Sequence, residues 1–260
     1  MITASVLKRW LPGLSVVVLA VALFDLTAAQ MGGIYLPRVT LIAASFEENW
    51  LFDAVETDLL PSLGRMGIGY ALALLAGLIA GLILGMALQA DHVLTPLIDF
   101  LRCIPATALI PLTVVLLGIG DLPKILLIAF TCFWPVLIST RAAIRTIDPV
   151  MAESMTVCSV TGRDRIRYLI LPAALPQFLA GARVALALAL IMAVVTEMVA
   201  STNGLGYFVV HAQRTFSIAD MWSGVALIGL LGYLFNLLFG AVQWVLLRKY
   251  PAAMTTRSSR

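Results

Sequence analysis

Long apolar runs, each close to the length that crosses a lipid bilayer, dominate the sequence. A membrane-spanning α-helix needs about 20 apolar residues, and six segments approach that length. The clearest is Met66–Ala90, which contains no charged residue, and the weakest is residues 10–29, which Pro12 and Asp25 interrupt. The other four cover roughly residues 103–119, 125–140, 177–200 and 221–247. No segment alternates apolar and polar residues as barrel strands do, so the pattern predicts an all-α, polytopic membrane protein with six transmembrane helices.

Composition excludes several other classes of protein. The chain is 61% hydrophobic and 12% charged, whereas roughly a quarter of the residues in a soluble domain are charged. A disordered chain, a secreted disulfide scaffold and a conventional cytosolic enzyme are therefore excluded. The three cysteines are too far apart for a CxxC pair or a disulfide framework. No basic face suits nucleic acid, and we interpret the first span as an uncleaved helix because no clean cleavage site follows it.

The distribution of basic residues predicts the orientation of the chain. Six spans place both termini on one side, and if that side is the cytoplasm, 13 of the 17 basic residues lie in cytoplasmic segments or helix ends. These are Lys8, Arg9, Arg102, Arg141, Arg145, Arg163, Arg165, Arg167, Arg183, Arg248, Lys249, Arg257 and Arg260. The external residues are Arg38, Arg65, Lys124 and Arg214. Because cytoplasmic loops carry the excess of Lys and Arg, both termini are predicted to be cytoplasmic.

The first external loop is acidic and contains a helix-start signal. Ser45 and Glu48 fit a capping box, which predicts a short external helix over about residues 46–60. The acidic residues of this loop lack the spacing of a calcium-binding loop. We therefore expect a solvated helix face and no metal site.

Small residues and prolines predict how the spans pack. A small residue at every fourth position of the second span allows another helix to approach closely; these residues are Ala73, Gly77, Gly81 and Gly85. The partner helix could belong to the same subunit or to a second copy. Kinks are expected near Pro105, Pro111 and Pro135, because proline removes a helical hydrogen bond.

The chain has no motif for ATP hydrolysis or proteolysis. A P-loop requires Gly directly before Lys, but Leu7, Pro123 and Arg248 precede the three lysines. No HExxH or GxSxG string supports a zinc protease or a serine hydrolase. Gly118–Asp121 resembles the GxGD string of intramembrane aspartyl proteases, but its only candidate partner, Asp25, has no matching motif. We therefore expect a non-catalytic chain that binds no cofactor.

Two charged residues lie inside the fifth span, where charges are costly and often functional. Arg183 and Glu197 are 14 residues apart, about 21 Å along a helix, so they cannot pair directly. Arg183 could extend to the inner interface. Glu197 could either tie the Asn203–Gly206 loop to the span or line a polar path, and a structural tie would tolerate Glu197→Gln.

The longest cytoplasmic connection, about residues 141–176, has the features of a docking element. Pro149 suits the first turn of a helix, and Glu153 follows near its N-terminal end, where a negative charge is favourable. Gly162 allows a tight turn at the helix end, and we expect Pro172 and Pro176 to stop the chain before it re-enters the membrane. The pattern favours a short helix along the inner face; a charged solvated loop is the alternative.

This connection resembles the EAA motif of permease subunits in binding-protein-dependent ABC importers. Glu153 is followed nine residues later by Gly162, and residues 169–172 (LILP) close the segment where the family has its I-x-L-P ending. Ser154–Met155 depart from the two alanines that the family prefers. The residues that this resemblance assigns to ATPase coupling are Ala152, Glu153, Ser154, Gly162, Arg163, Leu171 and Pro172.

Further strings, in the same order and on the predicted sides of the membrane, resemble nitrate/sulfonate/taurine-type permeases. They are residues 62–65 (SLGR), 101–105 (LRCIP), 109–112 (LIPL), 118–121 (GIGD), 197–198 (EM), 204–207 (GLGY) and 229–232 (GLLG). The same resemblance removes the protease interpretation, because these permeases carry a matching turn at Gly118–Asp121.

The resemblance implies one transmembrane permease domain over residues 1–260, with the type I ABC importer permease fold, in a bacterial inner membrane. Two copies would form a homodimer around a path worked by alternating access. Two cytosolic P-loop ATPase subunits would bind ATP and Mg²⁺, and an extracytoplasmic substrate-binding protein would deliver the solute. Candidate path or gate residues are Glu197, Asn203, Gly204, Gly206 and Pro111.

The substrate class follows from the subgroup alone. The resemblance implies a small anion such as nitrate, a sulfonate, taurine or an aromatic carboxylate, although the subgroup also includes permeases for thiamine-precursor-like compounds. The alternative function is an ATP-independent secondary transporter or channel. Such proteins usually show inverted repeats or a relay of intramembrane charges, and no convincing repeat joins the two halves of this sequence.

The predicted orientation is testable at the C-terminus. A cysteine introduced by Ser258→Cys, with Cys103, Cys132 and Cys158 replaced, should react with a membrane-impermeant thiol reagent only from the cytosolic side. Labelling from outside intact cells would contradict the topology with both termini inside.

Overall fold

The computed structural model describes residues 3–30, 35–158, 160 and 162–248, and none of these residues lies in a strand. The helices are α1 Thr3–Gln30, α2 Val39–Glu48, α3 Leu60–Met86, α4 Leu88–Arg102, α5 Ile110–Leu117, α6 Asp121–Arg145, α7 Pro149–Val157, α8 Gly162–Arg165, α9 Leu171–Ala200, α10 Leu205–Arg214 and α11 Ile218–Arg248. Short helical segments join some of them: η1 Asn49–Asp53, η2 Val55–Leu59, η3 Ala106–Leu109 and η4 Ile166–Ile170. The prediction of an all-α fold is confirmed.

Within the described residues, four helices are long and apolar enough to cross a membrane by themselves. They are residues 55–86, 121–145, 162–200 and 218–248. The pair α4 and η3–α5 provides a fifth crossing if it is counted as one span, bent by 74°. In α1 the apolar stretch, Val18–Gln30, is shorter than these four spans. A polytopic membrane fold follows, and the count of six spans stays a prediction.

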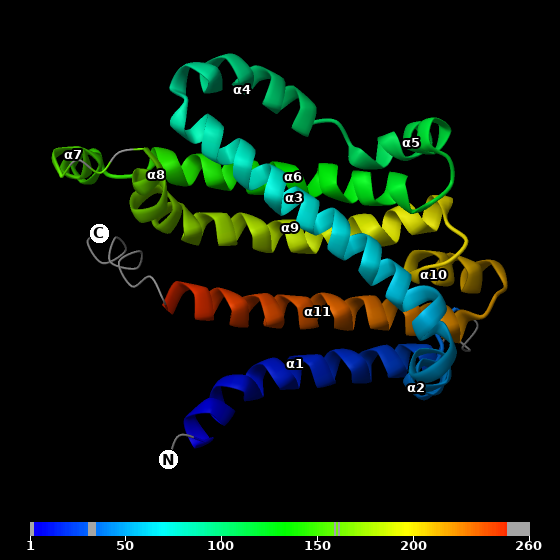
Figure 1. Ribbon diagram of the computed structural model, residues 1–260. Helices are drawn as coiled ribbons and strands as arrows, with labels where there is room; N and C mark the ends of the chain where they lie inside the picture. The colour runs from blue at the N-terminus through cyan, green and yellow to red at the C-terminus, as the bar shows by residue number, and fades with distance from the viewer. Residues whose placement is uncertain (1–2, 31–34, 159, 161, 249–260) are drawn as a thin grey trace.

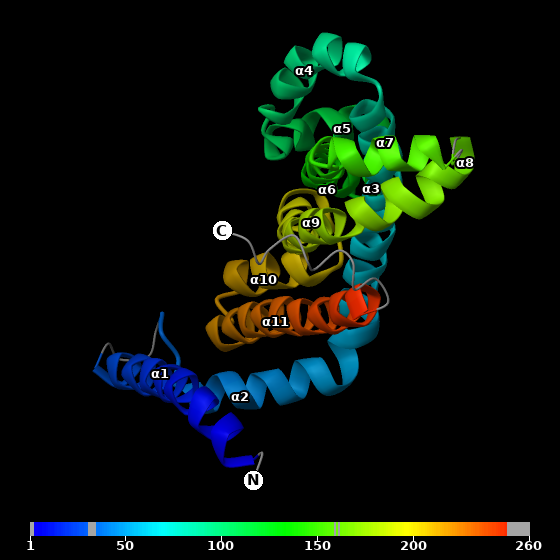
Figure 2. The ribbon, with the colours of Figure 1, turned by 90° about the vertical axis from the view of Figure 1, so that its left-hand side faces the viewer.

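The spans form a layer that one helix crosses obliquely. Figure 1 shows α6, α9 and α11 running in nearly the same direction, with α3 passing diagonally across α6 and α9. Figure 2, viewed along the layer, shows α6, α9 and α11 in a row with α3 on one side. The start of α1, the end of α11, and α7 and α8 lie at one end of the bundle, while α2 and α10 lie at the other.

Glycines allow α3 and α6 to touch along their backbones. A Cβ atom on Gly77 would lie 2.8 Å from Val136, and one on Gly81 would lie 2.6 Å from Thr140. Gly85 has the same relation to Ile144. The small residues that the sequence singled out therefore pack against a helix of the same chain.

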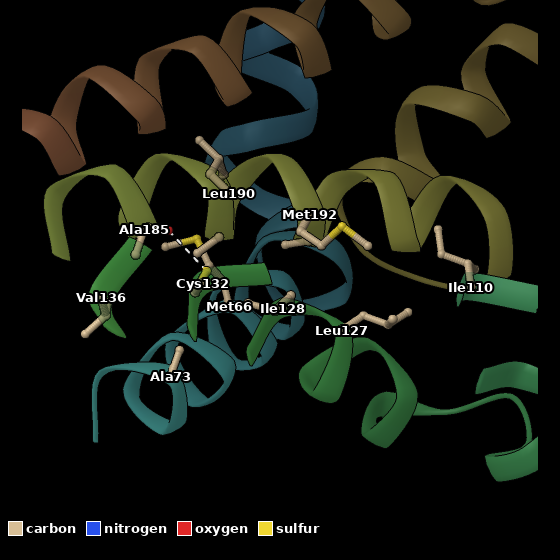
Figure 3. Packing of buried hydrophobic residues seen from close by; sticks show 12 residues of the cluster. Met66, Ala73, Ile110, Leu127, Ile128, Cys132, Val136, Ala185, Leu190 and Met192 are labelled. Carbon is tan, nitrogen blue, oxygen red and sulfur yellow. Dashed lines mark hydrogen bonds between the residues drawn. The ribbon is translucent and has the colours of Figure 1, made fainter. Parts of the chain in front are cut away.

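The helix α9 closes the other side of this core. A Cβ atom on Gly181 would lie 2.4 Å from the Ser139 hydroxyl of α6. Figure 3 shows Cys132 beside Ala185, and the Cys132 thiol donates a hydrogen bond to the Ala185 carbonyl at 3.1 Å. Ile128 and Val136 are fully buried in the same cluster. Close contact of α3, α6 and α9 thus makes the apolar core.

The third span differs from its predicted range of 103–119. The chain turns at Ala87 and α4 begins at Leu88, so α4 follows α3 directly. The break comes at Cys103–Pro105, because Pro105 cannot continue the hydrogen bonding of α4. Arg102 therefore lies at the break, paired with Asp99 at 3.0 Å, and not in a loop. Pro135, by contrast, sits within the continuous helix α6.

The external helix also begins earlier than the capping box predicts. The helix α2 starts at Val39, and Ser45 lies within it. The Ser45 hydroxyl donates a hydrogen bond to Asp220 at 2.6 Å, at the start of α11. A distant carboxylate therefore replaces the local capping contact. The chain then continues through the π-helical turns η1 and η2 into α3.

The packing of α3 on α6 predicts a contrast between two glycines of one helix. Gly81→Ala should destabilise the protein by about 1–3 kcal/mol, because overpacking forces the two helices apart. Gly67→Ala is the matched control, since no atom lies within 4 Å of its added Cβ, and alanine favours a helix more than glycine does. Thermal unfolding in detergent measures both, and equal midpoints would contradict the close contact.

Candidate functional site

A buried carboxylate lies near the C-terminal end of α9, at the end of the bundle that the sequence predicts to be external. The side chain of Glu197 is fully shielded and accepts hydrogen bonds from the Ser62 hydroxyl at 2.7 and 2.8 Å. It also accepts from Arg65 Nη1 at 2.8 Å and from the Gly206 backbone N–H at 3.1 Å. In this conformation Glu197 faces no open path, and it contacts the loop that the structural-tie hypothesis assigned to it.

Arg65 joins four parts of the chain through one guanidinium group. Its Nε donates to Asp121 at 2.7 Å, at the start of α6, while Nη1 binds Glu197 of α9. Nη1 and Nη2 also donate to the carbonyl and the side-chain oxygen of Asn203, at 3.2 and 2.6 Å. The side chain is 6% exposed. Arg65 therefore ties the start of α3 to α6, α9 and the loop after α9.

Arg65 was counted among the external cations and within the SLGR string, and this role was missed. A usable signal was present, because Arg65 precedes Gly69, Ala73 and Gly77 at successive intervals of four residues. Residues four apart share one face of a helix. The cation therefore lies on the face that packs against α6.

The loop before α10 is shaped around the same carboxylate. Gly204 has a φ of +113°, and a Cβ atom there would lie 2.4 Å from the Glu197 carboxyl carbon. The next N–H groups bind acceptors: Gly204 donates to Asp58 at 2.7 Å, and Leu205 donates to Ser62 at 2.8 Å. Acidic groups at the first turn of a helix stabilise its unpaired N–H groups and its dipole. Asp58 and Glu197 thus cap α10 from other elements.

A second cation completes this outer network. Lys124, with a side chain only 6% exposed, donates to the Ser201 hydroxyl at 2.7 Å and lies 3.9 Å from Asp121. Ser201 in turn donates to the Asn203 carbonyl at 2.5 Å. The structure therefore brings the predicted residues Glu197, Asn203, Gly204 and Gly206 together, whereas Pro111 lies exposed in the first turn of α5.

The opposite end of the bundle has a smaller buried ion cluster. Asp91, 1% exposed and in the first turn of α4, lies 3.0 Å from Arg141 Nε and also pairs with Arg145. Both arginines belong to the last turns of α6, where a positive charge suits the helix dipole. In the sequence, these arginines were used only to predict the orientation of the chain in the membrane. Asp91 fixes the start of α4 to the end of α6.

The segment that resembles the EAA motif lies outside the core. The helix α7 begins at Pro149, as predicted, and Glu153 and Ser154 are exposed on it. Gly162 has a φ of +59°, but it begins α8 and does not end α7. Arg163 is exposed, and Leu171 and Pro172 lie in the first turn of α9.

The two prolines do not interrupt the return into the bundle. Pro172 occupies the first turn of α9, a position where a missing N–H costs little. Pro176 lies inside the helix, and helical structure extends from Gly162 to Ala200. The expectation that they stop the chain is therefore wrong, and α8 is joined to α9 through η4.

Comparison with known families gives a match over most of the chain. The sequence profile described as "Binding-protein-dependent transport system inner membrane component" matches residues 73–250. The putative aliphatic sulfonates transport permease SsuC of Bacillus subtilis (strain 168) is 30% identical over 86% of this chain and 82% of its own length. The taurine transport system permease TauC of Escherichia coli (strain K12) is 31% identical over 70% of this chain and 66% of its own length.

A third relative and two solved structures agree with this result. The nitrate import permease NrtB of Synechococcus elongatus is 27% identical over 80% of this chain and 78% of its own length. Two structures titled inward-facing conformations of the MetNI methionine ABC transporter match with TM-scores of 0.64 and 0.63 at 18% and 19% identity. They cover 72% and 75% of this chain and 94% and 96% of theirs, and they show that the fold is shared.

The outer network revises the expected effect of Glu197→Gln. One carboxylate oxygen faces Arg65 Nη1 and the other faces the Gly206 N–H, so either orientation of a glutamine amide places two donors together. We expect Glu197→Gln to destabilise the protein by about 1–3 kcal/mol. Glu197→Ala should cost about 3–5 kcal/mol, because it leaves Arg65 without one buried partner.

Thermal unfolding of the purified protein in detergent measures these losses. Glu56→Gln is the matched control, because Glu56 is an exposed carboxylate. If Glu197→Gln unfolds at the same temperature as the Glu56→Gln control, Glu197 is not the structural tie that the contacts indicate.

Proposed function

Because the chain belongs to the family of inner membrane components of binding-protein-dependent transport systems, we propose that it forms half of the membrane path of an ATP-driven importer. Two copies of the chain enclose the path. The ATPase subunits bind ATP and Mg²⁺ at the cytoplasmic end, while the chain itself performs no hydrolysis. The complex lies in a bacterial inner membrane, with α7 on the cytoplasmic side.

The observation that carries this proposal is the exposed apolar surface of α7. Val150 is 67% exposed and Val157 is 85% exposed, and Met151 lies between them at 51%. Figure 1 shows α7 projecting beyond the ends of the spans. Apolar side chains on a helix outside the spans favour a partner that covers them. A groove on a cytosolic ATPase subunit is such a partner, since short helices commonly dock into grooves.

The connections of α7 explain how a partner could move the bundle. The helix follows the end of α6 after a short turn, and α8 runs through η4 into α9. A force on this segment therefore acts on two helices of the core. Asp91 extends the effect to α4, because it is paired with Arg141 and Arg145 of α6.

The same two helices meet the outer ion network. Asp121 and Lys124 lie in the first turn of α6, Glu197 lies near the end of α9, and Arg65 contacts both helices. Changes in the angle between α6 and α9 would strain this network first. We assign it the role of an outer gate, closed in this conformation, that alternating access opens when the ATPase subunits move α7.

The proposed solute is a small anion or zwitterion such as a sulfonate, taurine or nitrate. This proposal rests on the named solutes of the relatives, SsuC, TauC and NrtB. An extracytoplasmic binding protein would deliver the solute at the end of the bundle where α2 and α10 lie.

Cross-linking tests the docking proposal directly. A Glu153→Cys variant lacking the native cysteines, treated in native membranes with a short thiol-to-amine reagent, should form an adduct with a P-loop ATPase identified by mass spectrometry. Solute uptake should stop when cellular ATP is depleted while the membrane potential is kept. Uptake that continues without ATP would establish the alternative, a secondary transporter or channel.

The positive φ of Gly162 predicts a contrast between two variants at one position. No atom lies within 4 Å of a Cβ atom there, so any effect is conformational. Gly162→Val should abolish ATP-driven uptake, because a β-branched residue is strongly disfavoured at positive φ. Gly162→Asn should retain most of it, because asparagine tolerates this region. Uptake normalised to the amount of protein in the membrane measures the difference, and normal uptake by the valine variant would contradict the coupling role.

A further inference from the structure

A cavity of about 420 Å³ lies between the first half of α9, at Arg183, and the last turns of α11. Its lining is Arg183, Gly240, Gln243, Trp244, Leu247 and Arg248. Two arginines and one glutamine therefore belong to the lining, and no acidic residue does. The remaining wall is apolar.

The two arginines differ from Arg65, Arg141 and Arg145, which are paired with carboxylates of the chain. Arg183 Nε donates to Asn236 of α11 at 2.9 Å, and the Arg248 guanidinium lies 5.2 Å from the centre of the Trp244 ring. In the described part of the chain no ion pair within 4.0 Å involves either arginine. Because like charges in a medium of low polarity repel strongly, this space favours an anion.

The position of the cavity indicates the source of that anion. Trp244 is 61% exposed, and it lies one turn before Arg248 at the end of α11. Exposed Trp beside Arg at the end of a span is typical of the interface between hydrocarbon and headgroups. The sequence after Asp220 contains no acidic residue and ends with further basic ones, Lys249, Arg257 and Arg260. Such a cluster is attracted to anionic lipid surfaces.

We propose that this cavity binds the phosphate of an anionic phospholipid in the cytoplasmic leaflet. Arg183 and Arg248 donate charge-assisted hydrogen bonds to the phosphate oxygens, which the planar guanidinium group suits. Gln243 adds a neutral donor, and Gly240 and Leu247 form an apolar wall for the glycerol backbone. The hydrogen bond from Nε to Asn236 holds the Arg183 side chain toward α11 while its terminal nitrogens serve the phosphate.

A lipid fits this space better than a soluble anion. The volume of 420 Å³ exceeds that of one phosphate group and adjoins the exposed apolar side of α11, where Leu238 and Val245 are about half exposed. A lipid can enter sideways from the bilayer and keep its acyl chains in the hydrocarbon. The site joins α9, which continues from the α7–α8 segment, to α11, so the lipid would brace the two helices at this end.

Native mass spectrometry of the complex as purified in mild detergent tests the proposal independently of membrane orientation. The probes are phosphatidylglycerol, which is anionic, and phosphatidylethanolamine, which is zwitterionic, with matched acyl chains. We expect the wild type to retain phosphatidylglycerol about tenfold more tightly, which corresponds to about 1.4 kcal/mol. The double variant Arg183→Gln/Arg248→Gln should lose that preference.

Two further variants separate charge at this cavity from general effects. Arg183→Lys keeps the charge and should keep most of the preference, which also shows that position 183 tolerates substitution. Arg102→Gln removes a half-exposed arginine at the α4 break, away from the cavity, and should change nothing. Equal retention of the two lipids by the wild type, or an unchanged preference in the double variant, would overturn the proposal.

A last comparison distinguishes a lipid from a free anion. Inorganic phosphate in large excess should leave phosphatidylglycerol bound, because the apolar wall contributes to lipid binding alone. If excess inorganic phosphate instead removes phosphatidylglycerol from the wild type, and the loss is as large as that caused by the double substitution, the cavity is a simple anion site. The lipid proposal then fails.

Discussion

The Arg65 guanidinium is the contact on which the outer half of this structure depends. It lies almost fully buried between Glu197, Asp121 and the oxygens of Asn203. Desolvating a guanidinium and a carboxylate is expensive, so such a pair is retained only where its geometry satisfies both groups. Here each partner comes from a different element. The cost of separating them therefore fixes how α3, α6 and α9 meet.

A network of this kind suits a gate because it has few intermediate states. Apolar contacts between helices weaken gradually as the helices slide, whereas a buried charge that loses its partner must be solvated or paired again. The outer ends of α6 and α9 should therefore either stay joined or separate fully with water entering. The glycine contacts between α3 and α6 deeper in the bundle provide a close-packed seam below that switch.

Hydropathy predicted much of the fold. The second, fourth, fifth and sixth spans are long apolar runs, and each of them forms a long helix in the structure. The third span was misplaced, since Pro105 shortens its apolar half while α4 carries Asp91, Asp99 and Arg102. The prediction that Ser45 caps the external helix was wrong for a related reason. Its local pattern fits a cap, but its hydroxyl binds Asp220 across 175 positions of sequence, a partner that no window of neighbouring residues contains.

In the candidate site, too, residues with partners nearby in the sequence were predictable, and residues with distant partners were not. Glu197 and the glycine loop were predictable, because a short carboxylate inside an apolar span must find donors nearby, and the following loop offers them. Asp91 and Arg65 were missed because their partners lie 50 or more residues away, in Arg141, Arg145 and Asp121. A single apolar run also says nothing about which face of a helix is covered by another, and for Arg65 that face decides its role.

The difference between covered and open helix faces also separates two groups of arginines. Arg65, Arg141 and Arg145 lie where helices of the chain meet, and each has a carboxylate of the same chain as its partner. Arg183 and Arg248 line the cavity between α9 and α11, for which we propose a lipid-facing position. A helix that faces lipid cannot obtain a carboxylate there without burying another charge in hydrocarbon. A lipid phosphate can serve as the anionic partner instead, because its charge already lies at the membrane interface. No carboxylate of the protein then has to be buried in hydrocarbon.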